Sequence, residues 1–116
     1  MRYSLPGLPP TVNHMYRHRG KITYKTADAK AWIKACLWEL QQQDLPDTPI
    51  AETVRVSLTF LSPDRRRWDI DNRVKAVQDL LMEAGIIEDD SLVWDLNVRR
   101  LRSDETRTDI EVEAIA

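Results

Sequence analysis

The fold is decided by one stretch of alternating residues, Thr53-Val54-Arg55-Val56-Ser57-Leu58-Thr59-Phe60-Leu61. Between Val54 and Phe60 every second residue is apolar, and the residues between them are polar or charged. Successive side chains of an extended chain point to opposite faces. The alternation therefore predicts a half-buried strand, with its apolar side chains toward a core.

Two helices are expected on either side of this strand. Residues 27–43 carry Trp32, Cys36 and Leu40 at intervals of four, behind Thr26 as a candidate N-terminal cap. Residues 72–84 carry a second apolar stripe, Val74, Val77, Leu81 and Ala84, and Gly85 suits a helix C-terminus. The sequence thus predicts two main helices that each bury one face.

Three further segments read as strands: residues 2–5, 92–100 and 106–114. Residues 14–25 are basic and contain a glycine, which favours a loop or an irregular hairpin. Adjacent strands at the end of the order β, loop, α, β, α, β, β indicate a mixed sheet. We therefore expect a single two-layer α+β domain over residues 1–116, with Trp68 and Trp94 in its core.

Composition points to an ordinary globular protein. The chain has 116 residues, of which 42% are hydrophobic, enough for one compact core. Its single cysteine, Cys36, cannot pair within the chain and lies on an apolar stripe, so we interpret it as a core residue in a reducing compartment. No apolar run approaches the ~20 residues of a membrane span. We expect a cytoplasmic protein that does not enter a membrane.

The formal net charge of -2 is low for a DNA-binding protein, but the charges are unevenly placed. Basic residues gather in the ranges 17–25, 65–67 and 99–102. Acidic residues gathered at a metal site would be partly neutralised there, and the remaining surface would be slightly basic. The plainer interpretation of each basic cluster is a solvated loop or strand end.

Acidic residues are concentrated at two points of the chain. Asp69 and Asp71 open the second helix, Lys75 follows four residues later, and Glu88-Asp89-Asp90 comes after the helix. Gathered carboxylates repel one another unless a cation or solvent screens them, and Mg²⁺ prefers carboxylate oxygens. Asp69 and Asp71 would point the same way in extended backbone. A helix running back across the sheet would bring the second acidic group to the first.

These residues also have structural interpretations. An aspartate at a helix N-terminus commonly caps it and stabilises it by ~1 kcal/mol. The run Glu88-Asp89-Asp90 could be a solvated turn, and Lys75 an exposed helix lysine paired with Asp71 or Asp79. Spacing alone leaves these alternatives open.

A longer pattern resembles a known family. The segments Asp69-Ile70-Asp71-Asn72-Arg73-Val74-Lys75-Ala76-Val77-Gln78-Asp79-Leu80-Leu81 and Ala84-Gly85-Ile86-Ile87-Glu88-Asp89-Asp90 resemble those of RusA-type Holliday junction resolvases. A looser match is Pro6-Gly7-Leu8-Pro9-Pro10-Thr11-Val12-Asn13, followed by a basic stretch. The resemblance covers most of the chain.

The resemblance implies a small homodimeric, Mg²⁺-dependent endonuclease of the kind that phages and prophages often encode. Such enzymes nick four-way DNA junctions symmetrically during recombination and repair. It implies that Asp69, Asp71 and Asp90 are catalytic acids that hold the metal and that Lys75 is essential, and it leaves open whether Asp89 takes the place of Asp90. Our candidates for contacts to phosphates are the basic residues Arg17, Arg19, Lys21, Lys25, Arg65, Arg66 and Arg67.

Three other functions compete with this hypothesis. A non-catalytic DNA-binding protein would use its acidic residues only for capping and solvation. Another metal-dependent nuclease would cut flaps or RNA with the same acidic cluster. A small interaction module would show no salt-dependent affinity for DNA.

Overall fold

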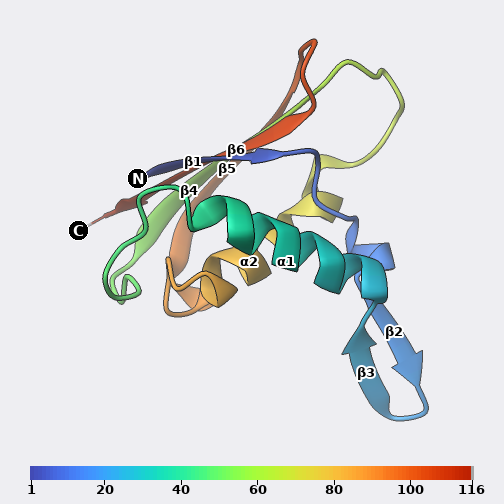
Figure 1. Ribbon diagram of the computed structural model, residues 1–116, viewed down its shortest axis with the longest axis horizontal. Coiled ribbons are helices and arrows are strands. Elements are labelled where there is room, and N and C mark those ends of the chain that lie inside the picture. Colours follow the sequence, from blue (N-terminus) through green and yellow to red (C-terminus); the bar gives the residue numbers. More distant parts are fainter. Residues whose placement is uncertain (116) are drawn as a thin grey trace.

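A four-stranded mixed sheet forms one layer of the molecule in this computed structural model, which describes residues 1–115 (Figure 1). Its strands, in spatial order, are β1 (Arg2–Pro6), β6 (Arg107–Ala114), β4 (Val54–Ser62) and β5 (Val93–Arg102). The central strand β4 runs antiparallel to β6 and parallel to β5. The expected mixed sheet is therefore confirmed.

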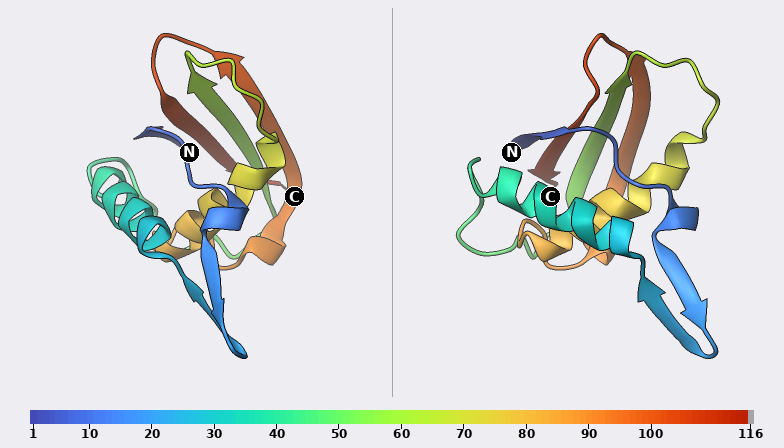
Figure 2. Two further views of the ribbon diagram at one scale, coloured as in Figure 1. Left: turned by 90° about the vertical axis from the view of Figure 1, so that its right-hand side faces the viewer. Right: turned by 45° about the vertical axis from the view of Figure 1, so that its right-hand side comes forward.

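Two helices make the second layer, α1 (Ala27–Leu40) and α2 (Val74–Glu83), and both lie on the same side of the sheet (Figure 2). The hydroxyl of Thr26 caps α1 by accepting a hydrogen bond from the Ala29 N–H at 3.2 Å. A short 3₁₀ turn, η2 (Ile70–Arg73), precedes α2, so the regular helix starts two residues later than expected. Gly85 follows α2 at a φ of 72°, a left-handed conformation that suits glycine. The two-layer α+β class is confirmed.

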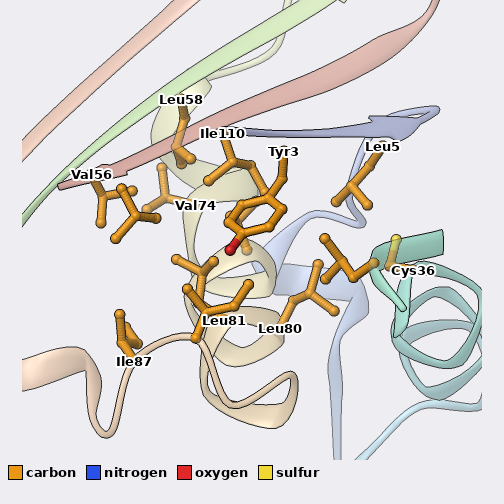
Figure 3. Close-up of a cluster of buried hydrophobic side chains, with 14 of the residues drawn as sticks. Tyr3, Leu5, Cys36, Val56, Leu58, Val74, Leu80, Leu81, Ile87 and Ile110 are labelled. Atoms are coloured by element: carbon orange, nitrogen blue, oxygen red, sulfur yellow. The ribbon is translucent and has the colours of Figure 1, made fainter. Parts of the chain in front are cut away.

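The core lies between the helices and one face of the sheet (Figure 3). Val56 and Leu58 of β4 face Val74 and Leu81 of α2 there, while Cys36 lies in the wall made by α1. Burial raises the pKa of the Cys36 thiol to about 12. A thiol that stays protonated is a poor nucleophile, which agrees with the expectation that Cys36 is a core residue.

The strand β5 differs from the sequence expectation at Trp94. We expected this side chain in the core, but it is 76% exposed. The cause is a register shift between β4 and β5: Val54 pairs with Val93 and Arg55 with Asp95, which leaves Trp94 as an extra residue. In the described part of the chain β5 pairs only with β4, so its other edge is open.

The basic segment near the N-terminus is more regular than expected. After a 3₁₀ turn, η1 (Val12–His14), the strands β2 (Tyr16–Arg19) and β3 (Ile22–Lys25) form an antiparallel hairpin that projects from the body of the molecule (Figure 1). Gly20 lies in its turn at a φ of 63°. Between residues 1 and 115, no helix has the length and apolar character needed to cross a bilayer.

Candidate active site

Asp69 and Asp71 are exposed at the start of η2, where the loop of residues 63–69 returns from β4. Asp69 occupies the capping position of η2, yet its side chain accepts no capping hydrogen bond. The capping position of α2 belongs to Arg73. Helix capping therefore does not explain either aspartate, and their carboxylates remain open to solvent.

Lys75 contacts two carboxylates, one on its own helix and one beyond it. Its Nζ lies 3.3 Å from Oδ2 of Asp90 and 3.2 Å from Oδ1 of Asp79. Asp90 begins the 3₁₀ turn η3 (Asp90–Leu92), so the segment after α2 brings this acid back to Lys75 in the first turn of the helix. Desolvation lowers the pKa of Lys75, but the hydrogen bonds and charges of Asp79 and Asp90 outweigh it and raise that pKa. Lys75 is therefore a fixed positive charge near neutral pH.

The neighbouring residues Asp89 and Asp90 have different contacts. Asp89 accepts a hydrogen bond from the Ser91 N–H at 3.0 Å and caps η3, and this bond lowers its pKa. Asp90 contacts Lys75 instead. Of the two, Asp90 is thus the residue that the structure brings to Lys75.

A groove of about 460 Å³ lies between α2 and the edge strand β5. Its polar lining residues are Asp71, Lys75 and Gln78, and its apolar lining residues are Ile70, Val74, Leu96 and Val98. Asp71 and Lys75 therefore face the same space, as their spacing of four residues predicts.

The acids nevertheless do not form a closed metal cage. Within residues 1–115, no three Asp, Glu, His or Cys side chains gather closely enough to hold a metal ion by themselves. Mg²⁺ is usually bound through one or two carboxylates together with waters and substrate phosphates, so it does not need such a cage. The exposed side chains of Asp69 and Asp71, and Asp90 beside Lys75, offer carboxylate oxygens of the kind that Mg²⁺ prefers.

Sequence reasoning missed a stack of side chains around Trp68, the residue directly before Asp69. Two guanidinium groups lie over the Trp68 ring, with the Cζ of Arg73 at 4.5 Å and the Cζ of Arg100 at 4.0 Å from its centroid. Phe60 meets the same ring edge-on at 6.0 Å. Arg100 also donates to Oδ1 of Asp64 at 3.0 Å, which holds the start of the loop. Trp68 is thus half-buried beside the core rather than within it.

The residues predicted to contact DNA lie in two exposed segments, with the exception of one lysine. Arg17, Arg19 and Lys21 are exposed on the hairpin, and residues 65–67 are exposed in the loop before Asp69. Figures 1 and 2 show the hairpin and this loop on the same side of the molecule, with η2 between them. Lys25 is the exception, because its Nζ lies 3.7 Å from the buried carboxylate of Asp79.

Comparison with known proteins agrees with this arrangement. The model of the family described as endodeoxyribonuclease RusA matches residues 6–113. The chain belongs to this family. Among its RusA relatives, the crossover junction endodeoxyribonuclease RusA of Aquifex aeolicus (strain VF5) is 32% identical over 88 residues, which cover 76% of this chain and 69% of the relative. The protein of the same name from Escherichia coli (strain K12) is 33% identical over 93 residues, which cover 80% of this chain and 77% of the relative.

The resemblance seen in the sequence is therefore confirmed at the level of the RusA family. The matched span extends over both basic segments, η2, α2 and η3, so all the candidate residues lie inside it. Their individual roles stay predictions.

Proposed function

We propose that this chain is a divalent-metal-dependent endodeoxyribonuclease that resolves four-way DNA junctions by paired symmetric nicks. The observation that carries the proposal is the contact of Lys75 with Asp90 beside a groove that Asp71 lines, between two exposed basic segments. Membership in the RusA family and the printed names of the relatives, crossover junction endodeoxyribonuclease, support the same activity.

The proposed metal is Mg²⁺, which Asp69, Asp71 and Asp90 would hold. When bound, it would stabilise negative charge on the scissile phosphate and orient the attacking water. Asp69 and Asp71 suit this role because they are exposed and uncapped. Asp90 suits it because it contacts Lys75, which lines the groove.

Lys75 would supply positive charge to the phosphate or to the leaving oxygen. An ammonium group acts as a point charge on phosphates, and charge-assisted hydrogen bonds are about twice as strong as neutral ones. The two acidic partners keep Lys75 protonated, so its charge is available whenever substrate arrives.

The basic residues on either side of η2 would hold the DNA backbone. Arg17, Arg19, Lys21 and residues 65–67 are exposed and carry no obligatory role in the core. Contacts of this kind fix position on the DNA without reading its sequence. Structure selectivity would then come from the spacing of the two basic segments.

We also propose that the working form is a homodimer. A junction has two equivalent strands to cut, and a twofold dimer presents two equivalent sites. The open edge of β5 is the candidate interface, because it exposes Trp94 and Leu96 and has no partner strand among the described residues. Antiparallel pairing of two copies centred on Asn97 would place Asp95 of one copy opposite Arg99 of the other, which makes the edge charge-complementary to itself.

The decisive experiment compares cleavage of a labelled four-way junction with cleavage of a linear duplex of the same sequence, with Mg²⁺ and with a chelator. We expect paired symmetric nicks in the junction only, and none with chelator. Equal cutting of flaps or linear DNA would instead identify a less selective nuclease. Tight junction binding without any cleavage would identify a binding protein.

A further inference from the structure

A buried carboxylate next to the proposed site has no role in the mechanism so far. Asp79 lies on α2 one turn after Lys75 and is only 6% exposed. A buried charge is costly unless it is paired and hydrogen-bonded. Its partners therefore indicate why the protein keeps an acid at this position.

The two oxygens of Asp79 face different parts of the molecule. Oδ1 lies 3.2 Å from the Nζ of Lys75. Oδ2 accepts a hydrogen bond from the Tyr16 hydroxyl at 2.8 Å and lies 3.7 Å from the Nζ of Lys25. One carboxylate thus meets the active-site lysine on one side and the basic hairpin on the other.

Tyr16 and Lys25 are cross-strand neighbours at the base of the hairpin, where β2 starts and β3 ends. Both side chains reach the same oxygen of Asp79, so the base of the hairpin is fixed to α2 at that point. Lys75 continues the series of contacts to Asp90 at 3.3 Å. The hairpin and Asp90 are therefore joined through Asp79 and Lys75.

We propose that Asp79 is a positioning residue, which holds the ammonium group of Lys75 at the groove and ties that placement to the seating of the β2–β3 hairpin. This inference rests on the role proposed above for Lys75. Because Lys75 has only two carboxylate partners in the described structure, loss of Asp79 leaves its long side chain held by Asp90 alone. The hairpin residues proposed to contact DNA would then no longer be held at a fixed position relative to Lys75.

Asp79→Asn removes the charge with almost no change in shape, and Glu83→Gln is its matched control. Glu83 is exposed one turn further along α2 and loses the same charge. For Asp79→Asn we expect single-turnover junction cleavage to fall by about 10- to 100-fold, the size of effect that a misplaced catalytic group produces. Junction affinity should change by less than about twofold, since no phosphate contact is lost. Glu83→Gln should cleave like the unmodified protein.

A spectroscopic readout separates positioning from general destabilisation. The chain has five lysines, so ¹⁵N-labelled lysine side chains give few signals, and Lys75→Arg identifies the one from Lys75. In the unmodified protein we expect the Lys75 ammonium protons to be protected from exchange by their two carboxylate partners. Asp79→Asn should abolish this protection while the backbone spectrum stays folded. An unchanged Lys75 signal together with an unchanged cleavage rate would overturn the inference.

A second variant keeps the test valid if Asp79→Asn does not fold. Tyr16→Phe combined with Lys25→Met removes the hairpin side of the network and leaves the Asp79–Lys75 contact in place. We expect slower cleavage in this variant with the Lys75 signal retained, and a cleavage rate equal to that of the unmodified protein would refute the link to the hairpin. If the unmodified protein cleaves no junction, the proposed function fails, and the Lys75 signal alone then decides whether Asp79 positions this lysine.

Discussion

At the scale of single residues, Asp89 and Asp90 carry the same charge but have different tasks in the structure. Asp89 caps η3, while Asp90 contacts Lys75. Because asparagine caps a 3₁₀ or helical turn nearly as well as aspartate, Asp89→Asn should leave the turn intact. The pair is therefore a matched test of which acid serves the metal.

We predict that Asp90→Asn lowers the junction cleavage rate by ~100-fold or more, since metal-assisted charge stabilisation is worth several kcal/mol. Asp89→Asn should stay within about twofold of the unmodified protein because the asparagine oxygen can still accept the capping hydrogen bond from Ser91. Single-turnover rates at saturating Mg²⁺ measure both. The reverse order of the two effects would transfer the ligand role to Asp89.

Asp71→Asn should abolish cleavage and keep or tighten junction binding, because it removes negative charge next to the phosphate. Binding in Ca²⁺ or chelator, measured by fluorescence anisotropy, separates the two effects. A variant that loses both binding and folding would show that Asp71 is structural instead.

Sequence reasoning named the candidate acids but left the choice between Asp89 and Asp90 open. The spacing of residues predicts which element a residue belongs to. It does not predict the direction in which the backbone points the side chains of two adjacent residues at the start of a turn. It missed Arg100 as well, since its contact with Trp68 joins segments that lie over 30 positions apart in the chain. No local pattern reports such a contact.

At the scale of elements, the segment before η2 depends on the stacked Trp68. Trp68→Ala should lower the free energy of unfolding by about 2 kcal/mol, through lost apolar contact and two cation–π interactions of about 0.5–1 kcal/mol each. Trp68→Phe should lose less, because a smaller aromatic ring still offers a face to the guanidinium groups of Arg73 and Arg100. Urea denaturation midpoints measure the difference, and equal losses in both variants would show that the stacking contributes nothing.

The projecting hairpin is predicted to act as a DNA-binding element. Arg17→Ala combined with Arg19→Ala should weaken junction binding and reduce the slope of log affinity against log salt by about 1 to 2. Lys30→Ala combined with Lys34→Ala removes the same charge from exposed positions of α1 and is the control. An equal loss of affinity in the two double variants would mean that binding depends on the total charge of the protein and not on the hairpin.

The elements themselves could be predicted to within a few residues because their apolar periodicities are clear. The direction in which the Trp94 side chain points could not be predicted. It depends on the extra residue in the pairing of β5 with β4, and the alternation of residues within β5 does not show that irregularity. The hairpin was likewise uncertain from sequence, since its exposed strands bury almost nothing and so show no apolar alternation.

At the scale of the whole molecule, the homodimer is the main untested prediction. Trp94→Arg would place a cation opposite Arg100 of the second copy in the pairing centred on Asn97, so it should dissociate the dimer. Trp38→Arg is the matched control, because Trp38 is 62% exposed on α1. Sedimentation velocity should give about twice 13.5 kDa for the unmodified protein and the control, and about 13.5 kDa for Trp94→Arg. A dimeric Trp94→Arg variant would locate the interface elsewhere.

The order of strands in the sheet also affects the stage of folding at which the protein can gain nuclease activity. The groove needs β5 beside α2, and β6, which follows β5 in the chain, must insert between β1 and β4 before the sheet is complete. Pairings between distant segments form late in folding because loop closure opposes them. The groove that Asp71 and Lys75 line therefore forms only after β5, which follows both residues in the chain, has reached its place beside α2. We therefore expect a chain of this topology to gain nuclease activity only late in folding, after β5 has paired with β4 beside α2.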